Sequence, residues 1–383
     1  MKLALLALAL IAVLAAAALL PVRPYLDFQV IYHADLGWLR GIAPYDHAGQ
    51  VNMIAELAGV PASQVYVLPF PYPPLYALST LWLARLPIDL AARAWFGLNL
   101  LLFLLSMWLL TEALPAAKRA ILVAAGLLWP PVLGGLFVGQ YDFPVLLGAV
   151  LMIHALRQEK ALLVAVAAAL LTLKPHLGGP VVVLVLIKLA QRRDGVGRDA
   201  LLATLAAGAI LFGLGFLASA NWPVDYVRSL TAFGSLGGVS ACTQCVSLST
   251  ALVRTAGGGL QAALWISVGI AVLCCGWSVL RWRHVASTPS GLVAAGILII
   301  MLVSPYLLNY DYVLLLVPFI ELARGARSAL EWIGVVLAYA VPVFGLGLLG
   351  TAGNVSLVLS ACILSALAVR TLTRDVASQA AGA

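Results

Sequence analysis

Three carboxylates and two histidines gather in one polar stretch of an otherwise apolar chain. Asp27, His33, Asp35, Asp46 and His47 follow the end of the first hydrophobic segment. A carboxylate near low-dielectric surroundings can hold its proton more tightly than usual, which suits it to act as a general base. The same residues could hold a metal ion, but their spacing matches no specific metal-binding template. We therefore expect acid–base chemistry here, with Asp27 as the base and without a metal or other cofactor.

The composition decides which elements must position these residues. Hydrophobic residues make up 63% of the chain and charged residues only 10%, whereas soluble proteins carry roughly 25% charged residues. Apolar runs of about 17–25 residues recur, and each is long enough to cross a bilayer core of roughly 30 Å. The sequence predicts an all-α, polytopic transmembrane bundle that forms a single integral membrane domain over residues 1–383.

Positive charge indicates the topology of this bundle. The net charge of +7 comes from short clusters between apolar runs, a pattern that sets orientation in membranes and does not indicate nucleic-acid binding. The clusters are Lys118/Arg119, Arg157/Lys160, Lys188 to Arg198, Arg281/Arg283, Arg324/Arg327 and Arg370/Arg374. Placing all six in the cytoplasm predicts about twelve spans with both termini inside. The expected spans are 2–20, 91–110, 119–137, 142–156, 160–173, 177–190, 200–218, 258–280, 290–303, 310–322, 328–348 and 354–370.

The segments between these spans contain two large extracytoplasmic loops, 21–90 and 219–257. In the first loop, apolar residues mixed with Asp35 and Arg40 suggest a short interfacial helix that Gly41 and Pro44 break. A proline-rich entry then leads into 75–86, which we interpret as a half-helix dipping in from outside; a tilted crossing is the alternative. Cleavage of 2–20 as a signal peptide is the alternative to a first span.

The predicted extracytoplasmic ends contain most of the unusual polar residues. Lys174 lies there beside His176, on the side where positive charge is not expected, and a lysine at a membrane edge suits a lipid-linked phosphate. Gln140, Asp142 and Asp311 lie at other outer ends of spans, although Asp142 and Asp311 could simply cap helices. Ionisable groups at membrane depth are costly and tend to be functional. We expect one polar pocket on the outer face.

The five cysteines do not form a zinc pattern. Cys242 and Cys245 fall in the outer loop, where a disulfide could form in an oxidising compartment. The other cysteines, Cys274, Cys275 and Cys362, fall in spans and are expected to pack. The cysteines therefore suggest no redox or metal chemistry for the site.

An ordered set of motifs resembles glycosyltransferase family 87, the polyprenyl-phosphate-mannose-dependent mannosyltransferase-like membrane proteins. The motifs are D-F-x-V-x-Y with G-x-x-P-Y (Asp27 to Tyr45), F-x-Y-P-P-L (Phe70 to Leu75), G-Q-x-D (Gly139 to Asp142), L-K-P (Leu173 to Pro175) and S-P-x-x-x-x-Y-D (Ser304 to Asp311). Each motif is short, and their order is the more specific signal. The similarity runs from the first helix to about residue 322.

The resemblance implies GT-C architecture, an essential Asp in the first outer loop, and inverting transfer outside the membrane. The donor would be a polyprenyl-phosphate-linked sugar and the acceptor a glycolipid or glycan, with membrane lipids around both. Well-studied members carry histidines in the late motif where this chain has Tyr310 and Asp311, so the role of those histidines does not transfer. The expected substrate-binding residues are Lys174, Tyr32, Asp35, Tyr45, Tyr72, Gln140, Asp142, His176, Tyr310 and Asp311.

Two other classes of protein remain open. A lipid or small-solute transporter would also place polar residues and broken helices near the membrane. Its polar groups would be expected at the midplane, however, and the sequence has no evident internal repeat. A scaffold of a larger envelope complex has no specific feature in its favour.

Overall fold

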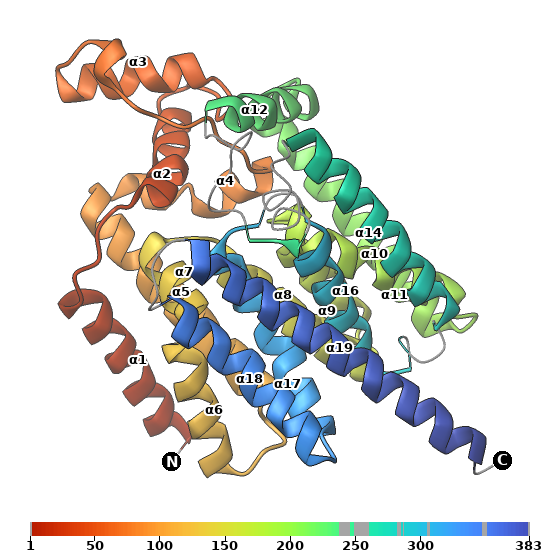
Figure 1. The fold of residues 1–383 in the computed structure, drawn as a ribbon. Coiled ribbons are helices and arrows are strands. Elements are labelled where there is room, and N and C mark those ends of the chain that lie inside the picture. Colours follow the sequence, from red (N-terminus) through yellow and green to blue (C-terminus); the bar gives the residue numbers. More distant parts are fainter. Residues whose placement is uncertain are drawn as a thin grey trace. The chain divides into compact units, whose positions relative to one another are not determined.

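The computed structural model describes residues 2–236, 246–248, 260–281, 285, 287–304, 307–346 and 351–381. Within these ranges the regular elements are all helices, and no strand occurs (Figure 1). The predicted all-α class is confirmed. Cys242 and Cys245 lie outside the described residues. By its own contacts the chain divides into two compact units, which are described separately here.

Unit 1 comprises Met1–Leu105, Gly135–Pro144 and Ala206–Ser240. Its elements are α1 (Lys2–Leu19), α2 (Leu26–Leu39), α3 (His47–Ala58), η1 (Ala62–Gln64), α4 (Pro74–Thr80), η2 (Leu83–Arg85), most of α5 (Ile88–Leu110), η3 (Gly215–Leu217) and α12 (Trp222–Leu236). Helix α2 contacts α3, α4 and η2. It ends just before Gly41, whose φ of +81° turns the chain in the left-handed conformation that glycine adopts most easily.

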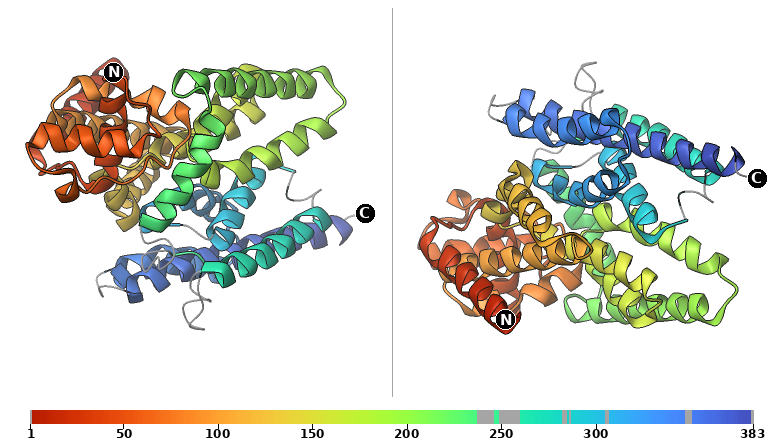
Figure 2. Two further views of the ribbon diagram at one scale, coloured as in Figure 1. Left: turned by 90° about the horizontal axis from the view of Figure 1, so that it is seen from above. Right: turned by 90° about the horizontal axis from the view of Figure 1, so that it is seen from below.

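Unit 2 comprises Ser106–Gly134, Val145–Leu205 and Ala241–Ala383. Its elements include α6 (Ala116–Leu128), α9 (Ala161–Leu171), α10 (Pro175–Gln191), α14 (Leu260–Leu280), α16 (Pro289–Val303), η5 (Asn309–Leu315), α17 (Leu316–Gly325), α18 (Ala329–Leu346) and α19 (Thr351–Ala381). Helices α7 (Pro130–Val138), α8 (Asp142–Arg157) and α11 (Gly195–Leu214) run from one unit into the other. Helices α18 and α19 lie side by side (Figure 2).

Helix α16 is central to unit 2, because it contacts α10, α14, α17, α19 and η5. Its Gly296 allows a close approach to α10: a Cβ there would lie 2.9 Å from a Val181 methyl carbon. Only a residue without a side chain fits at that distance. The mostly buried, apolar face of α16 includes Leu292, Val293 and Ile297.

Each predicted span coincides with helical structure, but the number of crossings stays a prediction. Among the described residues, Ile88–Leu110 and Gly195–Leu217 are long and apolar enough to cross a membrane. The predicted span 119–137 is broken, because α6 and α7 meet at an angle of 59°. Pro130 and Pro131 follow the break, and a proline disfavours helical geometry in the residue before it. In the described residues, shorter apolar stretches of 10–17 residues lie within α9, α10, α14, α16, α18 and α19.

The segment 75–86 forms two short pieces. Helix α4 has 7 residues and η2 has 3. At 1.5 Å per residue, α4 is only about 10 Å long, well short of a bilayer core of roughly 30 Å. Both pieces contact α2. The proline-rich entry therefore delivers Tyr72 and Tyr76 to the helix that carries Asp27.

Candidate functional site

Asp27 lies in the first turn of α2, half-buried. Its Oδ1 accepts a hydrogen bond of 2.6 Å from Nε2 of Gln140. The N-terminus of a helix favours negative charge, because its unpaired N–H groups point toward that end. The ionised form of Asp27 is therefore stabilised on two sides while part of the residue reaches solvent. This combination suits a group that must accept a proton.

Gln140 is held in place by α5. The carbonyl of Gly139 accepts a hydrogen bond of 2.9 Å from Trp95 Nε1, and the carbonyl of Gln140 accepts one of 3.1 Å from Asn99 Nδ2. Gly139 has a φ of +78°, and a Cβ there would lie 3.0 Å from the Cβ of Phe28. Glycine is thus required twice over, by backbone conformation and by contact with α2. The turn fixes the Gln140 amide against the helix that carries Asp27.

Two tyrosines extend this hydrogen-bonded chain. The Tyr72 hydroxyl donates to Oε1 of Gln140 over 3.4 Å, and the Tyr45 hydroxyl donates to the Tyr72 carbonyl over 2.9 Å. The side-chain amide of Gln140 consequently accepts a hydrogen bond from Tyr72 through Oε1 and donates one to Asp27 through Nε2. Tyr72, Gln140 and Asp27 come from three separate motifs, and folding brings them together in unit 1.

An aromatic cluster adjoins this chain. The Tyr72 ring stacks on Tyr76 with centroids 4.0 Å apart, and Tyr76 in turn lies 3.8 Å from Tyr141. Trp95 lies 4.9 Å from Tyr141 on the other side. The Tyr141 hydroxyl is hydrogen-bonded to Ser79. Tyr76, Tyr141 and Trp95 are buried, so these rings pack in the core of unit 1 behind the half-buried Tyr72.

Asp35 differs sharply from Asp27 although both belong to α2. It is fully buried, and neither carboxylate oxygen accepts a well-formed hydrogen bond from the described part of the chain. Burial raises the pKa of Asp35 well above its ordinary value, and the Thr80 hydroxyl offsets this only in part. That hydroxyl donates to the Tyr76 carbonyl at 2.9 Å. Burial in the interior of unit 1 therefore favours the protonated form of Asp35.

The other polar residues of the first loop have structural partners. Asp46 caps α3 by accepting from the Gly49 N–H at 2.9 Å, and a His47 ring nitrogen lies 2.8 Å from the Val67 carbonyl. The Tyr32 hydroxyl donates to the Leu86 carbonyl at 2.7 Å. Burial lowers the pKa of His33 to about 4. In the described ranges, no three His, Cys, Asp or Glu residues lie close enough together to hold a metal ion.

Unit 2 contains a second polar centre. Lys174 Nζ lies 3.0 Å from Asp311 Oδ1, and the two side chains are only 3% and 2% exposed. The ammonium also lies 5.1 Å from the centre of the Tyr310 ring, a cation–π contact. Asp311 Oδ2 accepts from the Leu308 N–H at 2.7 Å, so Asp311 caps η5 as well. His176 interacts electrostatically with both charged groups.

The sequence predicted Lys174 and Asp311 as separate substrate contacts and missed their pairing. The available signal was two opposite charges in strongly apolar surroundings, because a buried charge needs a partner. Trp95, Asn99, Tyr76 and Tyr141 were also missed. Polar and aromatic residues along an apolar helix, such as Trp95 and Asn99, could have identified α5 as a support for the site.

Unit 1 thus holds Asp27, Tyr32, Asp35, Tyr45, Tyr72, Gln140 and Asp142, and unit 2 holds Lys174, His176, Tyr310 and Asp311. Asp142 is fully buried in the first turn of α8. An all-helical chain with many apolar helices is typical of a membrane protein.

The family model of glycosyltransferase family 87 matches residues 70–305, more than half of the chain. The chain belongs to this family. It is accordingly a glycosyltransferase, and its apolar helices are those of a membrane protein. No curated protein and no solved structure matches the chain. The matched range covers Tyr72, Gln140, Asp142, Lys174 and His176, but it begins after Asp27.

Proposed function

We propose that the protein moves a hexose, such as mannose, from a polyprenyl-phosphate donor to an extracytoplasmic glycolipid or glycan acceptor, with inversion. The family membership supports sugar transfer. The observation that carries the proposed mechanism is the hydrogen bond of 2.6 Å between Gln140 Nε2 and Asp27 Oδ1. It fixes one oxygen of a half-buried carboxylate in a polar, aromatic corner of unit 1. The donor's lipid tail would lie among the apolar helices in the GT-C-like bundle, so no soluble donor site is needed.

In the proposed reaction Asp27 is the general base. An acceptor hydroxyl gives its proton to Asp27, and its oxygen attacks the anomeric carbon of the sugar. The new carbon–oxygen bond forms as the bond to the phosphate oxygen breaks, and the electron pair leaves with the polyprenyl phosphate. Attack opposite to the leaving group inverts the anomeric configuration. No cofactor is needed, because the donor's own phosphate is the leaving group.

Gln140 is the positioning residue in this mechanism. Its amide stays neutral at every pH of interest, so it can hold Asp27 without competing for the proton. Tyr72 fixes the amide from its other end. The ring of Tyr72 is half-buried and provides an apolar face against which a sugar could pack, while Tyr76 supports it from the core. Tyr32, by contrast, donates its hydroxyl hydrogen bond to the carbonyl of Leu86, just after η2.

In the proposed reaction, Lys174 interacts with the phosphate of the donor. A buried ammonium in an apolar unit can stabilise charge that develops on a leaving phosphate. Its pairing with Asp311 at 3.0 Å opposes this role, because the carboxylate already balances its charge. The phosphate role therefore requires that donor binding competes with Asp311, and His176 and Tyr310 are the other polar neighbours in this centre.

The test uses purified protein and a polyprenyl-phosphate hexose that is labelled in the sugar. Release of unlabelled polyprenyl phosphate together with labelled acceptor supports a glycosyltransferase with this donor. In sealed vesicles, movement of the intact donor across the bilayer without bond cleavage would show a transporter instead. A nucleotide sugar that is turned over in place of the lipid donor would overturn the donor assignment alone.

A further inference from the structure

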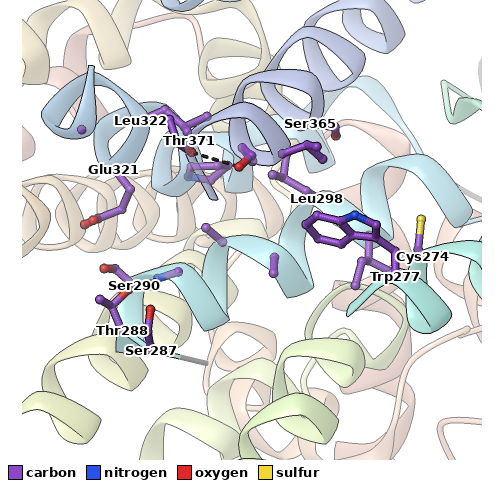
Figure 3. A pocket seen from close by; sticks show the side chains of 18 of the residues that line it. Cys274, Trp277, Ser287, Thr288, Ser290, Leu298, Glu321, Leu322, Ser365 and Thr371 are labelled. Atoms are coloured by element: carbon purple, nitrogen blue, oxygen red, sulfur yellow. Dashed lines mark hydrogen bonds between the residues drawn. The ribbon is translucent and has the colours of Figure 1, made fainter. Parts of the chain in front are cut away.

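Unit 2 also contains a groove that is separate from the residues of the two polar centres. It has a volume of about 540 Å³, within the range of small-molecule sites. Faces of α14, α16, α17 and α19 line it (Figure 3). The family assignment does not account for it, and none of the candidate site residues belongs to it.

The groove is amphipathic along its length. On α16 its lining begins with Ser290 and Gly291, passes small residues, and ends with Leu302. Twelve residues of helix correspond to about 18 Å. Figure 3 shows Ser287, Thr288, Ser290 and Glu321 toward one end, and Trp277 and Cys274 toward the other, beside Leu298. A polar end and a long apolar channel fit a ligand with a head group and a chain.

The polar end has an excess of positive charge. Arg327 lines the groove, is exposed, and forms no ion pair in the described part of the chain. The acid that faces the groove, Glu321, is balanced by Arg324 at 3.1 Å and Arg157 at 3.7 Å. Glu331 accepts from the Arg327 backbone N–H and lies 3.9 Å from Arg370. The groove lining thus combines a guanidinium without an acidic partner among the described residues with the hydroxyl groups of Ser287, Thr288 and Ser290.

We propose that this groove binds an anionic membrane phospholipid. Arg327 contacts the phosphate-bearing head group with help from the hydroxyls of Ser287 and Thr288, because guanidinium and hydroxyl groups donate well to phosphate oxygens. An acyl chain lies along α16 past Leu298 and Trp277. The proposal goes beyond the proposed function and holds whether or not the donor is a polyprenyl phosphate.

The position of the groove favours a bulk phospholipid over the sugar donor as the occupant. The groove's polar end adjoins the start of α16 and the end of α17, where arginines cluster. The Lys174–Asp311 centre belongs with η5, which follows the opposite end of α16. An arginine without an acidic partner near a membrane surface attracts anionic lipid head groups. The ligand at this end is therefore distinct in kind from the substrate of the transfer reaction.

Trp277 provides a direct probe, because it lines the groove. Purified protein in neutral detergent is titrated with phosphatidylglycerol brominated in its acyl chains, which quenches tryptophan fluorescence on contact. Brominated phosphatidylcholine is the comparison lipid. The chain has ten tryptophans, and any of them can be quenched by a brominated lipid. The quenching that is lost in the Trp277→Phe variant is therefore the part that comes from the groove.

Three variants test the assignment. Arg327→Gln should weaken phosphatidylglycerol binding about fivefold, the effect of removing one cation near an anionic lipid. Arg198→Gln is the matched control, since it removes an exposed cation of α11 that is outside the groove. Ala295→Phe should block the channel and abolish the Trp277-dependent quenching. If the Ala295→Phe variant fails to fold, Arg327→Gln still tests the proposal, because substitutions at exposed positions usually change the stability of the fold only slightly.

The proposal is supported if phosphatidylglycerol quenches more strongly than phosphatidylcholine, and if Arg327→Gln weakens this quenching while Arg198→Gln leaves it unchanged. Equal quenching by phosphatidylcholine would overturn the head-group assignment. Equal effects of the two arginine variants would overturn the role of Arg327. Displacement of phosphatidylglycerol by an equimolar polyprenyl phosphate would also overturn the proposal, because the groove would then be a site for the lipid carrier.

Discussion

The two polar centres of this protein satisfy their charged groups in opposite ways. In unit 1, Asp27 is half-buried and is held by the neutral amide of Gln140. In unit 2, Lys174 and Asp311 neutralise each other and are almost completely buried. A carboxylate that keeps its charge and its access to solvent can exchange protons with a substrate. A buried ion pair must first be separated, which costs free energy.

This comparison separates residues that a sequence would group together. All of them are polar residues at predicted outer ends of apolar segments. Desolvation decides between them, since removing two charges from water costs several kcal/mol per ion unless the ions pair well. The Lys174–Asp311 pair is therefore first a requirement of the fold of unit 2. Asp27 is half-buried and hydrogen-bonded to a neutral amide, so the fold does not require an opposite charge beside it.

The largest expected effect belongs to Asp27→Asn. The amide keeps the size of the side chain but cannot accept a proton, so transfer should fall by roughly 10² to 10⁴, the range for loss of general base catalysis. Expression and donor binding should stay nearly unchanged. Asp35→Asn is the matched control in the same helix and should be much milder. A variant Asp27→Asn that transfers at the parental rate would mean that another group is the base.

The next largest effect concerns the ion pair. Lys174→Ala or Asp311→Ala alone should lower the free energy of unfolding by about 3–5 kcal/mol, because each leaves one buried charge unpaired. The double variant Lys174→Met with Asp311→Leu should recover most of that loss. Thermal unfolding in detergent measures both.

The same double variant also separates structure from chemistry. If it folds but no longer uses the lipid donor, Lys174 contacts the donor phosphate as proposed. In that case Lys174→Arg should retain part of the donor use, because the charge stays while its geometry changes. A folded double variant with parental donor dependence would limit the pair to a structural role.

An intermediate effect is expected at Gln140. Gln140→Met removes the hydrogen bond to Asp27, and a hydrogen bond to a charged group contributes about 1.5–3 kcal/mol. Activity should fall by roughly tenfold to a hundredfold at saturating donor. Gln140→Glu places a second carboxylate beside Asp27, and like charges favour proton binding. The acidic limb of its pH–rate profile should therefore move to higher pH, which a purely structural role of Gln140 would not cause.

The smallest effect is a stability change at Asp35. Because burial raises the pKa of Asp35 above its ordinary value of 3.8, the folded state binds this proton more tightly than the unfolded state. The free energy of unfolding should therefore decrease as the pH rises above about 4, until the raised pKa of the folded state is passed. Asp35→Asn should remove this decrease and make the protein more stable at neutral pH. Parallel stability–pH curves for the parent and the variant would contradict a protonated Asp35.

The sequence by itself determined the class of fold and much of its layout. A composition of 63% hydrophobic residues requires that backbone polar groups be satisfied locally, which favours helices. Gly41 and the proline-rich segment before α4 marked where helical structure inside the first loop stops and starts again, because glycine and proline act through their own backbone geometry. The family could also be predicted, from an ordered set of short motifs.

The partners of the polar residues were decided by tertiary structure. Gln140 lies 113 positions from Asp27, and Lys174 lies 137 positions from Asp311. No local pattern specifies such distant pairs, since each depends on how several helices pack. The bend at Trp129 was missed for a related reason: apolar residues on both sides of two prolines look like one continuous span.

The contrast between Asp27 and Asp35 shows the limit most clearly. Both are aspartates of the same helix, eight positions apart. Contact of α2 with α4 buries one, while the turn at Gly139 and Gln140 supports the other. A side chain's charge state depends on the water and dipoles around it, and packing alone sets those surroundings.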